Sequence, residues 1–295
     1  MDRKQKYTSR QVMLSSDYEI FHYKDAYLNE ITLHHHDFYE IYFFLSGEVK
    51  YIIEGKIYKL LPGDVVIINS NELHQPLFED STKSYERIVL WITKEFVKSL
   101  STDMTNLSRC FEDPGLCSNN VLRLPLEVQQ SLKLTFIKLL DASDVKGYGS
   151  DIYSKVYVSD ILLIINQMLI NKEKNTHQIR VNTKKDALIQ SVIAFIDENI
   201  NRDTSLDEIA SKLYISKFYL SRVFKAHTNT TIHRYIVQKK LICAKELILE
   251  SIPLTEVYKR VGFGDYCNFF RAFKAEYGIT PKEFYNYMMK PASDR

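Results

Sequence analysis

LDEIASKLYI at residues 206–215 and SKFYLSRVFK at residues 216–225 are followed later in the chain by LTEVYKRVGF at 254–263 and DYCNFFRAFK at 265–274. Leu, Glu, Arg, Phe and Lys recur in register between the two pairs, at an offset of 48 residues in the first half and 49 in the second. A period of about 50 residues that occurs twice indicates two copies of one supersecondary unit.

Each copy has the pattern of a helix-turn-helix unit. A short amphipathic helix is followed by a break and then by a second helix with its own N-cap residue, Ser216 in the first copy and Asp265 in the second. The break in the second copy is Gly-Phe-Gly, which is typical of the turn between two such helices. The repeat therefore predicts helix-turn-helix units at residues 206–227 and 254–277.

The second helix of each copy has an apolar face and a polar face. The apolar positions expected to point inward are Leu220, Val223 and Phe224 in the first copy and Phe269, Ala272 and Phe273 in the second. The candidates for DNA contact are Ser216, Lys217, Tyr219, Ser221, Arg222, Lys225, Asp265, Tyr266, Asn268, Arg271 and Lys274. Their side chains carry donors and acceptors that can read base edges and hold phosphates. The alternative is a helical module that binds protein.

Residues 231–250, between the two copies, have the apolar spacing of one continuous helix. Twenty residues at 1.5 Å each span about 30 Å. That length is close to the roughly 34 Å between successive major grooves on one face of B-DNA. A stiff helix of this length could present both second helices to adjacent grooves.

The C-terminal third resembles the AraC-type DNA-binding domain, in which a long helix joins two helix-turn-helix units. The segments that carry the resemblance are SLDEIA at 205–210, YLSRVFK at 219–225, AKELI at 244–248, VGF at 261–263 and FFRAFKAEYGITP at 269–281, with Phe284 and Tyr285. It implies recognition helices at 216–227 and 265–277. The departures from the family pattern are Asn229 for a usual Gly, Lys240 for a usual Arg, Tyr258 for a usual Ala, and Asn268 and Phe270 in the second recognition helix. Asn adopts the left-handed conformation more readily than most residues.

The N-terminal part has a strand pattern. Short apolar runs at 40–45, 49–53, 65–68 and 85–92 alternate with turn signals. Evenly spaced short strands with glycine turns are typical of a barrel or a sandwich. We expect a cupin-like β-barrel over residues 1–125.

A histidine cluster lies in this part. The run HHHDFYE at 34–40, together with His74, resembles the cupin signature. In a strand, His34, His36 and Glu40 share one face. In AraC-type regulators, a cupin-like N-terminal domain implies sensing of a small-molecule effector.

Three roles are open for this cluster. The expected one is an effector pocket formed by His34, His36, Glu40, Tyr42 and His74, because a few polar groups among aromatic walls suit a sugar or similar metabolite. In that case no metal and no cofactor is bound. The alternatives are that His34, His36, Glu40 and His74 hold Fe, Mn, Zn or Ni, or that they are hydrogen-bonded core residues.

Composition limits the classes of protein. A chain of 295 residues, 45% hydrophobic and 26% charged, is globular and long enough for two domains. Residues 185–290 carry 16 Lys and Arg against 12 Asp and Glu, although the net charge of the chain is only +2. Four scattered cysteines without a CxxC pair, and a polar N-terminus, predict a cytoplasmic protein with reduced thiols. The most apolar stretch, 161–170, is too short to span a membrane.

The predicted architecture is α+β in two domains. Its parts are the cupin-like barrel at 1–125, connecting and dimerisation helices at 126–173, a linker at 174–185, and an all-α double helix-turn-helix domain at 186–290. We expect a DNA-binding transcriptional activator controlled by an effector, and not an enzyme, because GxSxG, the phosphate loop and HExxH are missing. The expected partners are double-stranded DNA, the effector, a second copy in a homodimer and RNA polymerase, with no membrane. The alternative is a metal-dependent cupin enzyme with a helical appendix.

Overall fold

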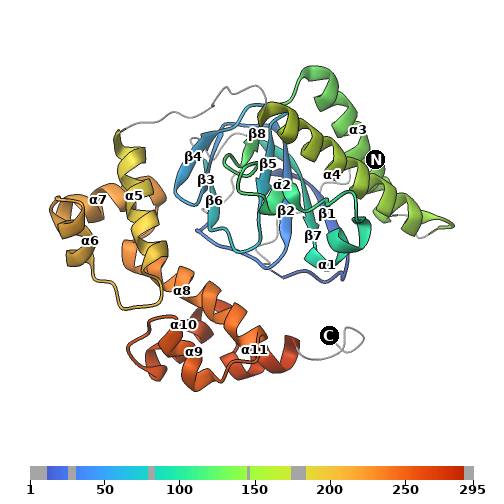
Figure 1. The fold of residues 1–295 in the computed structure, drawn as a ribbon. Coiled ribbons are helices and arrows are strands. Elements are labelled where there is room, and N and C mark those ends of the chain that lie inside the picture. The colour runs from blue at the N-terminus through green and yellow to red at the C-terminus, as the bar shows by residue number, and fades with distance from the viewer. Residues whose placement is uncertain (1–11, 26–30, 79–83, 145–146, 174–183, 289–295) are drawn as a thin grey trace. The chain divides into compact units, whose positions relative to one another are not determined.

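The computed structural model describes residues 12–25, 31–78, 84–144, 147–173 and 184–288 (Figure 1). The chain divides into two compact units, with the boundary between Val181 and Asn182. Most of the expected linker, at 174–183, lies outside the described residues. In the described parts of the chain, no helix is long and apolar enough to cross a membrane.

The strands described in the N-terminal unit form two antiparallel sheets. The larger sheet has the order β1 (Tyr18–Asp25), β7 (Tyr85–Ile92), β2 (Tyr39–Ser46), β5 (Val65–Ile68) and β8 (Val121–Leu122). The smaller sheet has the order β4 (Lys56–Lys59), β3 (Val49–Ile53) and β6 (His74–Phe78). The four strands predicted from apolar runs are confirmed. Within the described ranges the two sheets do not close into a continuous ring, so the expected barrel takes the form of an open two-sheet sandwich.

The larger sheet is buried on both faces, so β2 is buried almost throughout. Successive side chains of a strand point to opposite faces. Tyr39, Ile41 and Phe43 join the core that packs against the helices, whereas Tyr42 and Phe44 join the core between the two sheets. The strand alternation therefore puts Glu40 on the inter-sheet side.

The described residues of the N-terminal unit also form four helices. They are α1 (Lys94–Leu100), α2 (Arg109–Glu112), α3 (Leu126–Asp144) and α4 (Ser150–Glu173). Leu132, Phe136 and Leu139 of α3, with Ile161 and Ile165 of α4, pack into the core on the outer face of the larger sheet. The helices expected at 126–173 are thus part of this unit, and Figure 1 shows them as a long antiparallel pair.

The C-terminal unit is entirely helical over its described residues. Its helices are α5 (Lys184–Glu198), α6 (Leu206–Lys212), α7 (Lys217–Thr228), α8 (Ile232–Leu249), α9 (Leu254–Arg260), α10 (Tyr266–Tyr277) and α11 (Pro281–Met288). The Ser216 side chain accepts a hydrogen bond from the Tyr219 backbone N–H, and Asp265 accepts one from the Asn268 N–H, so both predicted N-caps are confirmed. Asn229 ends α7 in the left-handed conformation, with φ 55°.

The turn of the second helix-turn-helix unit is tied to the loop that precedes the first. The buried Lys240 ammonium on α8 donates a hydrogen bond to the Gly262 carbonyl at 2.5 Å. Gly262 has φ +71°, and a Cβ placed there would lie 2.5 to 2.6 Å from backbone atoms of Arg202. Burial lowers the pKa of Lys240. The close approach requires glycine at position 262.

Candidate DNA-binding helices and ligand site

The polar face of α7 is exposed as the sequence predicts. Leu220 and Phe224 are fully buried, while the six candidate positions from Ser216 to Lys225 are exposed. The Lys217 ammonium lies 3.0 Å from an Asp207 carboxylate oxygen. Exposed ion pairs of this kind contribute less than about 1 kcal/mol, so Lys217 can exchange this partner for a phosphate at little cost.

The polar face of α10 is also exposed, and its side chains are connected. Asn268 donates from Nδ2 to the Asp265 carboxylate, and Arg271 donates from Nη2 to Asn268 Oδ1 at 2.6 Å. Asp265 is thereby both the N-cap and the first member of a chain of polar contacts along the helix. Phe270, which the apolar pattern leaves outside, is instead half-buried.

Two exposed aromatic residues, one on α7 and one just before it, were not among the candidates. Phe218 is 79% exposed and Tyr214, in the turn before α7, is 95% exposed with φ 56°. The helical period that places Arg222 outside also places Phe218 outside, so the signal was present in the sequence. Apolar contact with a thymine methyl group is one use of such a side chain in a major groove.

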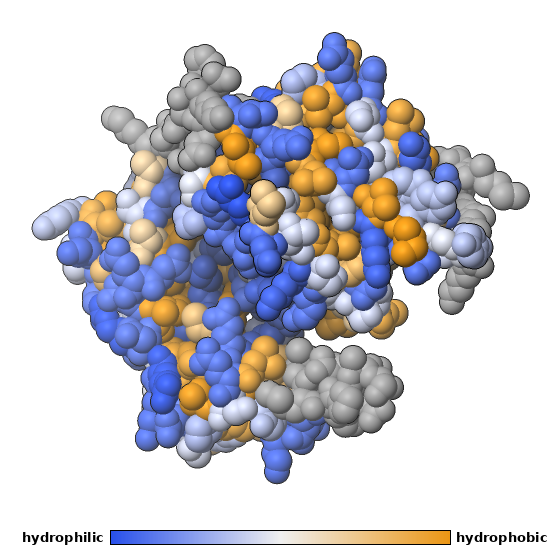
Figure 2. All heavy atoms as spheres, turned by 45° about the vertical axis from the view of Figure 1, so that its right-hand side comes forward, coloured by the Kyte–Doolittle hydropathy of each residue, from blue (hydrophilic) through white to orange (hydrophobic). Residues whose placement is uncertain are grey.

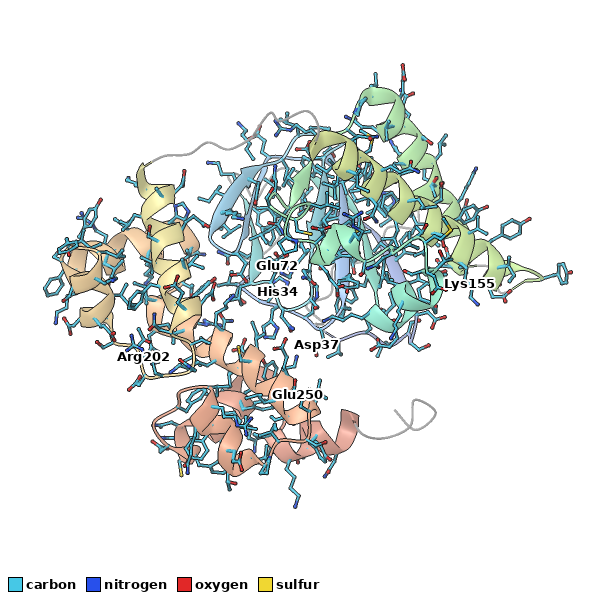
Figure 3. All side chains as sticks on the ribbon, in the orientation of Figure 1. His34, Asp37, Glu72, Lys155, Arg202 and Glu250 are labelled. Carbon is cyan, nitrogen blue, oxygen red and sulfur yellow. The ribbon has the colours of Figure 1, made fainter. Side chains whose placement is uncertain are left out.

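In the N-terminal unit, three of the predicted cluster residues come together. His36 Nε2 lies 2.7 Å from Glu40 Oε2, and His74 Nε2 lies 3.8 Å from the same oxygen. All three side chains are buried. The His34 ring lies beside them, with its centroid 4.3 Å from that of His74, but His34 is only partly buried. Figure 3 labels His34 and Asp37 on the segment that leads into β2, where Asp37 is exposed.

Backbone carbonyls orient these imidazoles. The Nδ1 atoms of His34, His36 and His74 lie 2.9, 2.9 and 2.8 Å from the carbonyl oxygens of Thr32, Phe38 and Glu72. A carbonyl oxygen only accepts, so each Nδ1 carries the proton and donates. Burial lowers the pKa of His34, and it lowers the pKa of His74 further, to well below its usual value. His74 is therefore neutral at pH 7, with the lone pair on Nε2.

Tyr42, the remaining predicted pocket residue, lies further along the same interior. Its ring centroid is 5.5 Å from that of Tyr51 and 6.2 Å from that of Tyr85. The Tyr42 hydroxyl is buried and has no hydrogen-bond partner among the described residues. Aromatic walls with a hydroxyl available for bonding are suited to a small polar ligand.

Arg87 is a polar residue of this interior that the sequence pattern did not single out. It is 2% exposed, pairs with Asp25, and has its guanidinium carbon 4.7 and 4.2 Å from the ring centroids of Tyr23 and Tyr85. The sequence did contain a sign of this role, because Arg87 is a charged residue in the apolar run 85–92 and alternates with Tyr85, Val89 and Trp91, which point into the core between the sheets. Arg87 gives the inter-sheet space a second polar group, separate from the histidine cluster.

These features define a two-domain regulator with a ligand-binding unit and a double helix-turn-helix unit. The AraC-like ligand binding domain matches residues 18–146, and a helix-turn-helix domain matches residues 209–286. Together these matches span more than half of the chain. The protein belongs to the AraC family of DNA-binding transcriptional regulators.

Individual relatives are distant but align along most of their length. LumQ from Photobacterium leiognathi, a probable transcriptional regulator, is 25% identical over 86% of this chain and 91% of its own. The transcriptional activator RhaS from Salmonella arizonae is 25% identical over 85% of this chain and 86% of its own. Among solved structures, fatty-acid-bound ToxT from Vibrio cholerae aligns over 92% of this chain and 95% of its own, with 16% identity and a TM-score of 0.39.

Proposed function

We propose that this protein is a cytoplasmic transcriptional activator that inserts α7 and α10 into successive major grooves of double-stranded DNA. The observation that carries the proposal is the exposed polar face repeated on both helices. Helix α8 joins the two units without a break and, at 18 residues, is about 27 Å long. Arg222, Lys217, Arg271 and Asn268 are the proposed base or phosphate contacts. RhaS is a transcriptional activator, which favours activation as the role of this chain. The proposed partner in activation is RNA polymerase.

The proposed effector is a small polar metabolite such as a sugar, bound between the two sheets. The pocket is formed by His34, His36, Glu40, Tyr42 and His74. Its polar atoms face a largely aromatic interior, and the Tyr42 hydroxyl is available for a ligand. The effector controls DNA binding only if it binds one arrangement of the protein better than another.

The proposed assembly is a homodimer through the outer faces of α3 and α4. The exposed apolar side chains on these faces are Leu134 and Ile137 on α3 and Ile152, Val156 and Leu163 on α4. In Figure 2, which brings this side of the N-terminal unit forward, hydrophobic side chains gather over the helical face. The spacing along each helix places these residues on continuous stripes, and a second copy of the same helices would cover them.

The test of DNA binding begins with the full-length protein and a random duplex library. Duplexes selected by the protein are compared with scrambled duplexes at several salt concentrations. The variants are Arg222→Ala and Arg271→Ala, and the matched control is Arg109→Ala, an exposed arginine of the N-terminal unit.

We expect the selected duplexes to bind tightly, with affinity that falls steeply as salt rises. A recognition-helix arginine that reads a guanine contributes about 1–3 kcal/mol, which is roughly 5- to 150-fold in affinity, and its loss relaxes sequence preference. Arg109→Ala should bind like the wild type. Failure to enrich any duplex, or wild-type affinity in both recognition-helix variants, would show that these helices do not read DNA.

The test of the effector is a thermal-shift screen of sugars and related metabolites with the intact protein. A ligand that binds only the native state must raise the melting temperature. A hit that loses its effect in Tyr42→Phe supports the inter-sheet pocket, whereas a hit unchanged by that substitution places the ligand elsewhere.

A further inference from the structure

We propose that His36, Glu40 and His74 bind a divalent transition-metal ion, with His34 as a fourth ligand. The proposal assigns a ligand class to the pocket described above and revises the expectation that no metal is bound there. The metal site rests on the geometry of the N-terminal unit alone, whereas its role as a signal for DNA binding rests on the proposed function.

The three ligand atoms already lie close to one another. His36 Nε2, Glu40 Oε2 and His74 Nε2 are all within 4.8 Å of each other and are buried. Two ligands on opposite sides of a metal, each bonded at about 2.1 Å, are about 4.2 Å apart. A small contraction of the cluster is therefore enough to bring all three into bonding distance.

The orientation of the histidines is that of metal ligands. A histidine that binds a metal nearly always donates its other ring N–H to a carbonyl, a carboxylate or water. Here Nδ1 of His36 donates to the Phe38 carbonyl at 2.9 Å and Nδ1 of His74 to the Glu72 carbonyl at 2.8 Å. His34 is held in the same way by Thr32. Both buried rings thus turn their Nε2 lone pairs toward Glu40.

Hydrogen bonding within the cluster does not account for all of its polar atoms. One proton can join His36 Nε2 to the Glu40 carboxylate at 2.7 Å. His74 Nε2, which is fully buried, then has no hydrogen-bond partner among the described residues. Leaving a buried polar atom unpaired is costly. A cation between the three side chains would satisfy both nitrogens and neutralise the carboxylate.

The ligand types favour a particular class of ion. Imidazoles with one carboxylate suit Zn²⁺, Fe²⁺ or Ni²⁺, whereas Mg²⁺ and Ca²⁺ prefer oxygen ligands. Glu40 belongs to the larger sheet and His74 to the smaller one, so the ion would connect the two sheets. Three or four protein ligands leave a coordination position for an oxygen atom of a small polar effector.

Trp91 provides a built-in reporter of this site. It is the single tryptophan of the chain, and its ring centroid lies 6.5 Å from that of His36. A paramagnetic ion such as Co²⁺ held by His36 would quench Trp91 fluorescence, and the visible absorption of Co²⁺ reports its coordination. Both signals are read on the full-length protein after dialysis against a chelator, with Co²⁺ and then Zn²⁺ as the added ions.

The variants separate ligands from neighbours. His74→Gln and Glu40→Gln each remove a proposed ligand. The matched control is His35→Gln, because His35 is also buried but is not among the three side chains whose ligand atoms lie within 4.8 Å of one another. His74→Cys keeps a ligand at position 74 and introduces a thiolate, whose charge-transfer band with Co²⁺ appears only if residue 74 binds the ion.

We expect one Co²⁺ per chain, with quenching of Trp91, displacement by Zn²⁺ and no competition from Mg²⁺. Loss of a hydrogen-bond partner of a metal ligand weakens metal binding roughly 10- to 100-fold, so His74→Gln and Glu40→Gln, which remove ligands themselves, should weaken Co²⁺ binding at least as much. His35→Gln should bind Co²⁺ like the wild type. His74→Cys should show the thiolate band, which also guards against a variant that simply fails to fold.

Absence of Co²⁺ and Zn²⁺ binding to the wild-type protein would overturn the proposal. So would binding without quenching of Trp91, or a His74→Cys protein that binds Co²⁺ without the thiolate band. Failure of the protein to bind any duplex would leave the metal site intact, so the two proposals fail separately.

Discussion

Substituting Gly262 by alanine should destabilise the C-terminal unit more than alanine at either of two other glycines in the same unit. Gly262 has φ +71°, and a Cβ there would lie 2.5 to 2.6 Å from the Arg202 backbone. Gly278 has φ +73° with nothing within 4 Å of its added Cβ, and Gly264 has neither a positive φ nor a close neighbour. The three glycines therefore separate backbone strain from steric overlap.

The expected costs follow from these geometries. A non-glycine residue in the left-handed region costs about 1–2 kcal/mol, which is the expected loss for Gly278→Ala. Gly262→Ala adds overpacking against rigid backbone, about 1–3 kcal/mol more, for a total of about 2–5 kcal/mol. Gly264→Ala should change stability by less than about 1 kcal/mol, with a gain favoured because alanine restricts the unfolded chain.

The assay is urea unfolding of the full-length protein followed by two signals. Far-ultraviolet circular dichroism reports the helices, and Trp91 fluorescence reports only the N-terminal unit. The urea midpoint of the dichroism transition should change least for Gly264→Ala, fall for Gly278→Ala and fall most for Gly262→Ala. The midpoint of the Trp91 transition should stay the same in all three variants. If Gly262→Ala were no more destabilising than Gly278→Ala, the close approach of Arg202 to the turn, and the link between the two helix-turn-helix units that rests on it, would be wrong.

Three further outcomes are expected. Cys267, the one exposed cysteine of the chain, lies on α10, so a selected duplex should slow its alkylation several-fold while a scrambled duplex does not; equal rates would place α10 away from DNA. Partial burial of Glu86 favours its neutral form, but hydrogen bonds from Lys24 and His22 outweigh this and hold its pKa below the usual 4.5. The stability that the Glu86 carboxylate contributes is therefore present above pH 4.5 and is lost as the pH falls through the lowered pKa. In Glu86→Gln, the free energy of unfolding followed by Trp91 fluorescence should fall less steeply at acid pH than in the wild type. The same steepness in both proteins would contradict the ion pair. Val156→Glu should convert the proposed dimer to a monomer in sedimentation, whereas Lys155→Glu, at the exposed neighbouring position, should remain a dimer. A dimer that survives Val156→Glu would exclude this face.

Local sequence patterns were sufficient for much of this fold. The repeat, the N-caps Ser216 and Asp265, and the left-handed Asn229 depend on neighbours a few residues away, and the structure confirms each of them. Strand alternation does not explain the contact between His36 and Glu40, because β2 begins at Tyr39 and His36 lies in the segment before it. The predicted strands did not include β1, β4, β6 or β8. For β4 and β8, with four and two residues, the segments carry too little periodicity.

Contacts between distant segments could not be predicted in this way. His74 meets Glu40 because the smaller sheet packs over the larger one, and Arg87 meets Asp25 because β7 pairs with β1. The positive φ of Gly262 is a local property, but its second constraint, a loop about 60 residues earlier in the chain that passes over it, exists only in the tertiary structure. Helix and strand periodicity specify which face of an element is buried, but the packing of whole elements sets which side chains on those faces touch. The metal site proposed here is a property of that packing.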